Sequence, residues 1–159
     1  MVFDEITEIL KKCAIFSELS DMEVKSVAEL GRIETFEPGD IIHEQGRLGT
    51  KLYVLSEGQV SLERKINLGN SRWGKITVFV LRNKSNRRLM GAWSSLVGEE
   101  HVQMCTAVCN TPTQIVSIDC SELRGFLLKN PVIRIKLLEK LVLLLRDRID
   151  RSYEAMETL

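Results

Sequence analysis

The sequence predicts an α+β, mainly β fold: a jelly-roll β-barrel of the double-stranded β-helix type, with short N-terminal helices and a long C-terminal dimerisation helix. Two observations predict it. Short β-type runs separated by turn residues fill the middle of the chain, and apolar residues at helical spacing occupy both ends. The 159 residues match the size of one domain. We therefore expect a single domain over residues 1–159, with helices at 1–32, the barrel at 33–120 and helices at 121–159.

The N-terminal segment is predicted to form two short helices. Apolar residues recur at helical spacing from Phe3 to Leu10. Ser20-Asp21-Met22-Glu23 has the pattern of a capping box, in which the serine and the glutamate each bond to the other's backbone N–H group. The second helix should therefore begin at this box.

The middle of the chain is predicted to alternate strands with turns. Glu37-Pro38-Gly39-Asp40 suits a type II turn, because proline fixes the first φ and glycine supplies the positive second φ. Further corners are expected at 46–49 and 57–58, with a loop at 67–74. Many short strands at this spacing indicate a barrel or jelly roll; the strands are expected at 40–43, 51–55, 60–63, 76–81, 102–108 and 114–118.

The C-terminal segment is predicted to end in one long helix that starts at Asn130-Pro131, since proline is tolerated at the first helical position. Branched residues at the first seam positions and leucine at the second favour two parallel helices. The alternative is a helix packed on its own barrel, and Leu137, Leu141 and Leu144 supply a second apolar face, so both can hold. The predicted homodimer seam comprises Ile135, Leu138, Val142, Leu145, Ile149, Ser152, Met156 and Leu159.

Charge and hydropathy restrict the possible partners. The 22 basic residues balance the 22 acidic ones, whereas a nucleic-acid module usually has a basic excess. No secretory signal pattern and no apolar run of bilayer-spanning length is present. We therefore expect a cytoplasmic protein, without membrane contact, whose four cysteines are reduced.

A set of glycine-containing motifs resembles the cyclic-nucleotide-binding domain family, which includes the catabolite activator protein and the regulatory subunits of cyclic-AMP-dependent kinase. The motifs are Phe36-Glu37-Pro38-Gly39-Asp40-Ile41-Ile42, Glu44-Gln45-Gly46, Gly49, Leu52-Tyr53-Val54-Leu55 and Gly58-Gln59-Val60. The resemblance covers nearly the whole chain and implies a regulatory or sensor domain with a small-molecule ligand. The family's transcription factors follow the dimer helix with a helix-turn-helix domain. The sequence ends at Leu159, before such a domain, so no DNA binding is expected of this chain alone.

The sequence departs from the family at the ligand cassette. Members that bind cyclic AMP or cyclic GMP carry a glycine-glutamate pair and, later, an arginine; the glutamate accepts from the ribose hydroxyl and the arginine neutralises the phosphate. Here the pair reads Gly91-Ala92, and Gln103 stands at the place of the arginine. Each charge-assisted hydrogen bond of this kind typically contributes about 1.5–3 kcal/mol to the free energy of binding. We therefore expect no binding of cyclic AMP or cyclic GMP in the family manner.

The candidate ligand pocket is built around this altered cassette. Backbone N–H groups at 94–96 could form an anion-friendly helix start, and two arginines upstream either reach the pocket or lie in a solvated loop. Glu99 and Glu100 would repel a phosphate if they face inward. Trp93 and Met104 are bulky enough to fill the pocket, which would leave a structural or protein-interaction module without a ligand. The pocket candidates are Gly91, Ala92, Trp93, Ser94, Ser95, Leu96, Gln103, Met104, Thr106, Arg87 and Arg88.

Histidines and cysteines give little support for a metal, a cofactor or catalysis. His101, Gln103, Cys105 and Cys109 share one face if 102–108 is a strand, but residues four apart along a strand are separated by roughly 13 Å. That distance forbids a disulfide or a shared zinc ion. A cupin-type metalloenzyme, the third possible class, needs a second histidine beside His43 that is absent. We expect no metal, cofactor or catalytic residue, structural cysteines, and His101 in a loop.

Overall fold

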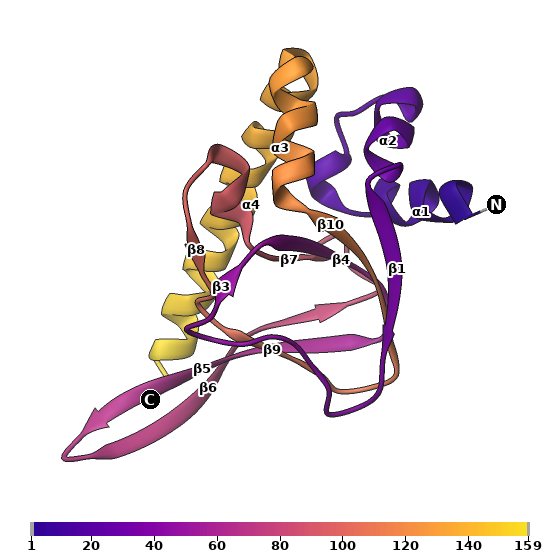
Figure 1. The fold of residues 1–159 in the computed structure, drawn as a ribbon. Helices are drawn as coiled ribbons and strands as arrows, with labels where there is room; N and C mark the ends of the chain where they lie inside the picture. Colours follow the sequence, from indigo (N-terminus) through magenta and orange to yellow (C-terminus); the bar gives the residue numbers. More distant parts are fainter. Residues whose placement is uncertain (1, 159) are drawn as a thin grey trace.

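The computed structural model describes residues 2–158, with side chains described from Asp4 to Thr158. Phe3 and Leu159, which belong to the predicted apolar patterns, have side chains outside this described part. Helices cover one side of a β-sandwich, and a long helix crosses it (Figure 1). The α-helices are α1 (Val2–Lys11), α2 (Asp21–Ala28), α3 (Cys120–Lys129) and α4 (Pro131–Met156), and the 3-10 helices are η1 (Ala14–Phe16) and η2 (Trp93–Val97).

The strands form three antiparallel sheets. One has the order β1-β10-β4-β7, the second has the order β2-β9-β5-β6, and the third pairs β3 with β8. The predicted jelly roll is confirmed, but the barrel is not closed, because β1 and β7 remain edges of one sheet and β2 and β6 of the other. The strands are β1 (Gly31–Phe36), β2 (Ile41–His43), β3 (Leu48–Gly49), β4 (Lys51–Glu57), β5 (Gln59–Gly69), β6 (Arg72–Arg82), β7 (Leu89–Gly91), β8 (His101–Val102), β9 (Thr106–Cys109) and β10 (Thr113–Asp119).

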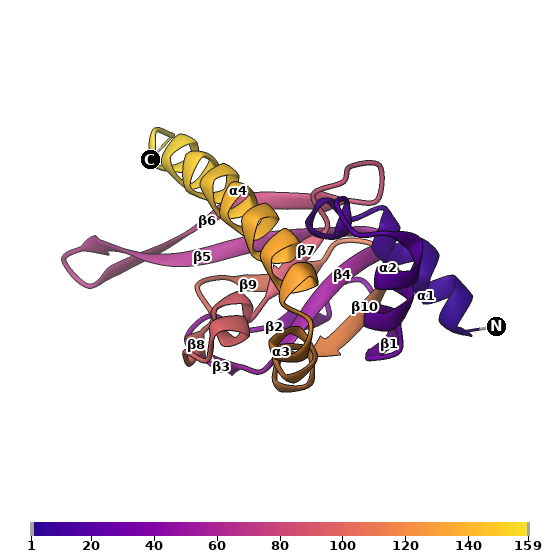
Figure 2. The same ribbon diagram turned by 90° about the horizontal axis from the view of Figure 1, so that it is seen from above.

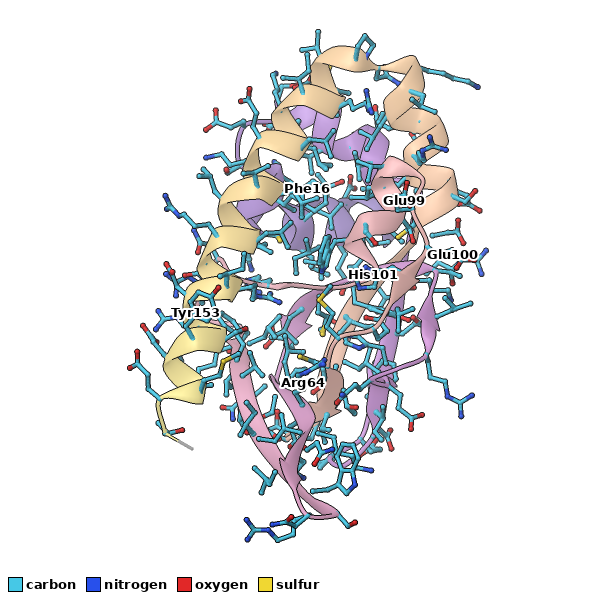
Figure 3. All side chains as sticks on the ribbon, turned by 90° about the vertical axis from the view of Figure 1, so that its left-hand side faces the viewer. Phe16, Arg64, Glu99, Glu100, His101 and Tyr153 are labelled. Carbon is cyan, nitrogen blue, oxygen red and sulfur yellow. The ribbon has the colours of Figure 1, made fainter. Side chains whose placement is uncertain are left out.

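Two apolar cores lie on opposite faces of the first sheet. Along β4, Leu52 and Val54 pack in a core under the helices, whereas Leu55 packs in a core between the two large sheets. This alternation follows from the two-residue period of a strand. The helix-covered core also contains Phe16, which Figure 3 shows enclosed between α4 and the N-terminal segment. The β1-β10-β4-β7 sheet is therefore buried on both faces, and α4 belongs to the domain's own core.

The helix termini follow the sequence signals. The Ser20 hydroxyl accepts from the Glu23 N–H, and Glu23 Oε1 accepts from the Ser20 N–H at 2.8 Å, so the capping box is confirmed. Gly39 has φ +91°, as the predicted turn requires. Pro131 occupies the first turn of α4.

Within the described residues, no helix is both long enough and apolar enough to cross a membrane, and the cytoplasmic location stays a prediction.

The loop predicted at 67–74 is instead the end of a long hairpin. β5 and β6 pair up to Gly69 and Arg72, and the connecting residues Asn70 and Ser71 both have positive φ, the geometry of a tight hairpin turn. The polar composition of 67–74 suggested a loop because the hairpin end is exposed on both faces and shows no apolar alternation. Figures 1 and 2 show this hairpin projecting beyond the rest of the domain. We refer to residues 64–77 as the arm.

The strand predicted at 102–108 is interrupted. β8 pairs with β3, whereas β9 pairs with β2 and β5, so the chain passes from one sheet to another at 103–105. At the crossing, the Gln103 N–H donates to the Arg47 carbonyl and the Gln103 carbonyl accepts from the Gly46 N–H, both at 2.8 Å. The assumption of a single strand face for His101 to Cys109 is therefore wrong.

Candidate ligand-binding site

A cavity of about 300 Å³ lies between the second large sheet, the crossing segment at 103–105 and α4. Its walls are mainly apolar, and they come from elements that are far apart in the sequence but adjacent in the fold. Figure 3 shows His101 at this place, between α4 and the strands. The lining residues are His43, Leu62, Val78, Phe79, Met90, Gly91, Trp93, His101, Gln103, Met104, Cys105, Leu145, Arg148, Ile149 and Ser152.

Arg148 supplies the cavity's charge. Its guanidinium carbon lies 4.5 Å from the centre of the Phe79 ring, a cation–π contact, and one of its N–H groups donates to the Leu89 carbonyl. Among the described side chains, no carboxylate lies within 4.0 Å of it, and neighbouring Asp147 pairs instead with Arg87 at 3.5 Å. Burial lowers the pKa of Arg148 to about 10, so it remains charged at neutral pH.

His43 contributes a neutral ring to the cavity wall. Its Nδ1 lies 3.0 Å from the Cys105 carbonyl oxygen, so Nδ1 carries the proton and donates. The opposite atom, Nε2, is buried and has no hydrogen-bond partner among the described residues. Burial lowers the pKa of His43 to about 4, against the raising effect of the Cys105 hydrogen bond. At neutral pH, Nε2 is therefore an unused acceptor.

His101 is a buried strand residue, so its predicted loop position is wrong. It is 3% exposed, because β8 turns it inward beneath η2. Its Nδ1 lies 2.7 Å from the Ser94 hydroxyl, and its ring meets Trp93 edge to face at 4.9 Å between centres. Burial lowers the pKa of His101 below its usual range. This ring also is uncharged at neutral pH.

Four of the eleven predicted pocket residues line the cavity: Gly91, Trp93, Gln103 and Met104. Ala92 and Leu96 lie instead in the core beneath the helices. Thr106 faces a separate groove beside Trp73 of the arm, and Ser95 faces a hollow beside Arg124. A Cβ built on Gly49 would overlap the Gln103 amide and approach the Ala92 methyl group to 2.9 Å, so these three residues pack together.

The two upstream arginines and the backbone of η2 do not reach the cavity. Arg87 is exposed. Arg88 is only 6% exposed, and its guanidinium donates to the carbonyls of Asn83, Leu55, Ser56 and Ser85. Neither the solvated loop nor the pocket role predicted for Arg88 therefore holds.

The helix start at 94–96 was predicted to bind an anion through its backbone N–H groups, but two of these groups donate to acceptors of the chain itself. The Ser94 N–H donates to His101 Nδ1 and the Ser95 N–H to the Ala92 carbonyl. Glu99 and Glu100 are exposed and lie at the edge of the molecule, away from the cavity (Figure 3).

Residues of the predicted dimer seam separate into two groups. Ile135, Val142, Ile149 and Met156 are 59%, 65%, 52% and 53% exposed. Leu138 and Leu145 instead pack against the helix-covered core, and Leu145, Ile149 and Ser152 line the cavity. One helix thus contributes to the cavity wall and carries an exposed apolar stripe.

Sequence reasoning missed Arg148, although a signal was present. Leu137 and Leu141 are buried in the core and Leu144 packs against it, and Arg148 continues the same spacing along α4. A charged residue at this spacing indicates a cation that faces the domain rather than a fully solvated one. His43 was considered only as a metal ligand, and Cys105 was expected to be structural. The described residues contain no group of three His, Cys, Asp or Glu side chains that could hold a metal ion.

The cysteines are free thiols in buried or half-buried positions. Cys13, Cys109 and Cys120 are buried, whereas Cys105 is partly exposed at the cavity wall. Burial raises the pKa of Cys13 to about 11 and of Cys120 to about 12, and it raises the pKa of Cys105 and Cys109 as well. These thiols are therefore protonated at neutral pH, which is unfavourable for nucleophilic or metal chemistry.

Known proteins share this fold. No family model matches the sequence. The global nitrogen regulator of Synechococcus elongatus is 30% identical over 128 residues, which are 80% of this chain and 53% of that protein, and its Nostoc counterpart is also 30% identical. The chain thus spans about half the length of the curated relatives it matches.

Solved structures of other proteins have a similar fold. A cyclic nucleotide-binding domain from Methylobacillus flagellatus has a TM-score of 0.73 at 21% identity, covering 96% of this chain and 80% of that chain. The sensor domain of the transcriptional regulator DNR from Pseudomonas aeruginosa has a TM-score of 0.67 at 20% identity, covering 94% and 95%. The chain is therefore a jelly-roll domain with the cyclic-nucleotide-binding fold. The resemblance read from its glycine motifs is confirmed at the level of the fold.

Proposed function

We propose that the chain is a homodimeric regulatory domain that senses a small molecule in the cavity beneath α4, without binding cyclic AMP or cyclic GMP in the family manner. The cavity carries this proposal. It is bounded by cassette residues Gly91, Trp93 and Gln103, and its wall includes the half-buried Arg148. Cavities of this size with a few polar groups are typical ligand sites. The names of the relatives, a nitrogen regulator and a transcriptional-regulator sensor domain, support a regulatory role.

The altered cassette supports the absence of cyclic-nucleotide binding. Ala92 has no acceptor on its side chain, is fully buried and lies outside the cavity lining. Gln103 is neutral, and its amide packs closely against Gly49. The N–H groups of Ser94 and Ser95 already have acceptors within the chain, so neither is free to bind a cyclic phosphate.

The exposed stripe of α4 supports a homodimer. Ile135, Val142, Ile149 and Met156 recur every seven residues with more than half of each side chain exposed, and Tyr153 lies on the same face at 60%. Exposed apolar stripes of this length on a helix are usually covered by a partner. The second positions of the predicted seam are turned toward the domain itself, so we propose that the contact uses the first positions and Tyr153.

Binding rather than catalysis fits the chemistry of the cavity. The thiol of Cys105 is protonated at neutral pH, and the Ser152 hydroxyl donates to the Arg148 carbonyl at 2.8 Å. In the part of the chain that the structure describes, His43 is hydrogen-bonded to the Cys105 carbonyl and His101 to Ser94, and neither ring is hydrogen-bonded to the Cys105 thiol or the Ser152 hydroxyl. We therefore propose that the chain is not an enzyme.

Calorimetric titration with cyclic AMP and cyclic GMP tests this function. We expect no binding of either nucleotide at micromolar concentration. A low-micromolar Kd for one of them would contradict the proposal. A thermal-shift screen of small metabolites tests the sensing role separately, because a ligand at a hundred times its Kd stabilises the fold by about 2.7 kcal/mol. No stabilisation by any compound would favour a protein-interaction module whose cavity takes no ligand.

A further inference from the structure

We infer that the ligand of this cavity is a small, singly charged apolar carboxylate whose carboxylate group pairs with Arg148. This inference rests on the proposed sensing function and specifies the chemical class of the ligand. It follows from the hydrogen-bonding state of Arg148, the polarity of the walls and the size of the cavity.

Arg88, which is buried, and Arg148, which is half-buried, differ in how their donors are satisfied. Arg88 has no carboxylate partner, yet four carbonyl oxygens accept from its guanidinium. Arg148 donates to one carbonyl, that of Leu89, and otherwise faces the Phe79 ring and the cavity. A cation that is partly removed from water is destabilised when it lacks a compensating partner. Arg148 is therefore the position at which an anion entering the cavity would be stabilised most.

No other ionisable group that lines the cavity compensates this charge. Outside the lining, the negative charge of Asp147 raises the pKa of Arg148, although the Asp147 carboxylate pairs with Arg87. His43 and His101 are neutral at neutral pH because burial lowers their pKa values. Cys105 is protonated because burial raises its pKa. No lining residue is an aspartate or a glutamate. The cavity therefore carries one positive charge and matches one negative charge on a ligand.

The apolar walls of the cavity determine the chemistry of the rest of the ligand. Leu62, Val78, Phe79, Met90 and Leu145 present hydrocarbon to the cavity. A ligand with a second anionic group would bury it without a partner, at high cost. A planar carboxylate can take two parallel hydrogen bonds from one guanidinium. A phosphate needs further donors, and the N–H groups of Ser94 and Ser95 are occupied.

The cavity volume limits the size of the ligand. A water molecule takes about 30 Å³ of liquid volume, so the cavity holds on the order of ten non-hydrogen atoms. Phenylacetate has this size and combines one carboxylate with an apolar ring. Phenylacetamide has nearly the same shape without the charge, and phenyl phosphate replaces the carboxylate by a phosphate. These three compounds are suitable probes.

The test measures the affinity of the whole chain for each probe by calorimetry, supported by thermal shift. We expect phenylacetate to bind, phenylacetamide and phenyl phosphate to bind at least about tenfold more weakly, and Arg148→Gln to weaken phenylacetate by about tenfold to a hundredfold. Arg146→Gln is the matched control, since Arg146 is exposed on the same helix and makes no cavity contact. It should bind phenylacetate as the unaltered chain does.

Arg148→Lys is a second variant that tests the inference even if Arg148→Gln fails to fold. It keeps the charge but not the paired donors, so we expect an intermediate affinity. Equal binding of phenylacetamide and phenylacetate, stronger binding of phenyl phosphate, or unchanged affinity in a folded Arg148→Gln chain would each overturn the inference while the sensing function stands. Failure of all three probes would overturn the inference, and the sensing function would then depend on the metabolite screen.

Discussion

Arg87 and Arg88 are adjacent in the sequence and lie in opposite environments. Arg87 is exposed and makes one ion pair with Asp147 at 3.5 Å. Arg88 is buried and ties the segment before β7 to the end of β4 through the carbonyls of Leu55 and Ser56, at 3.1 and 3.2 Å. The charge of Arg88 is therefore used for hydrogen bonding inside the domain.

Removing the Arg88 guanidinium should destabilise the domain strongly. In Arg88→Met, four carbonyl oxygens lose their donor, and we expect the free energy of unfolding to fall by about 3 kcal/mol. For a chain of this length, that loss lowers the Tm by about 6–12 °C. Arg87→Met should change the free energy of unfolding by about 0.5 kcal/mol or less, because exposed ion pairs contribute little. Thermal melts in which both variants unfold at the same temperature would contradict this account.

Arg88 and Arg148 mark the limit of what the sequence could reveal about the site. Ser20, Gly39 and Pro131 act through local backbone geometry, so their roles were readable from neighbouring residues. Arg88 and Arg148 act through carbonyls and a ring contributed by distant strands. No local pattern encodes those partners. Gly91, Trp93, Gln103 and Met104 were found because the family resemblance aligned them with a known cassette.

At the scale of elements, α4 has two different faces. Leu137 and Leu141 are buried in the domain core, whereas Ile135 and Val142 are exposed. The sequence showed both faces, and it also predicted the helix start. The sequence could not decide which face packs on the domain and which is exposed, because steps of three and four residues describe a coiled-coil seam and a core-facing stripe equally well.

Val142→Asp should separate the homodimer without unfolding the domain. Val142 is 65% exposed in the single chain, so the substitution leaves the core intact, but a parallel pair would bring two carboxylates together in a dry contact. We expect a dimer for the unaltered chain and a monomer for the variant in sedimentation at tens of micromolar. Met22→Asp is the matched control, because Met22 is an apolar side chain, 82% exposed, on α2. A monomeric unaltered chain would refute the homodimer itself.

At the scale of the whole molecule, the two cores share the β1-β10-β4-β7 sheet and should unfold together. The sequence located six strand segments along the chain because turn residues bound them. The sheet order, the open edges and the passage between sheets at 103–105 depend instead on long-range pairing. The arm was missed for a similar reason. Its strands are held by pairing with each other and not by burial of one face.

Stability of the whole domain should fall as the pH is lowered, through His43. Its pKa is about 4 in the folded chain and about 6.5 when unfolded, so protons bind preferentially to the unfolded state. The stability contributed by neutral His43 is complete above pH 6.5 and is lost as the pH falls toward 4. The free energy of unfolding should drop by up to about 1.4 kcal/mol per pH unit in this window. His101, whose pKa is also lowered, acts in the same direction.

Denaturation melts between pH 7 and pH 5 test this dependence, because most carboxylates stay ionised there. His43→Gln should show a flatter dependence than the unaltered chain. Identical slopes for the two chains would mean that His43 is not the group that titrates.

The chain's two tryptophans lie in separate places. Trp73 is 63% exposed on the arm, whereas Trp93 lines the cavity and meets His101 edge to face at 4.9 Å. Indole emission depends on the surrounding water and on nearby rings, so the intrinsic fluorescence of the protein contains two signals of different origin. With phenylalanine at position 73, the remaining emission would come from the cavity wall alone, and occupation of the cavity would be visible without any added dye.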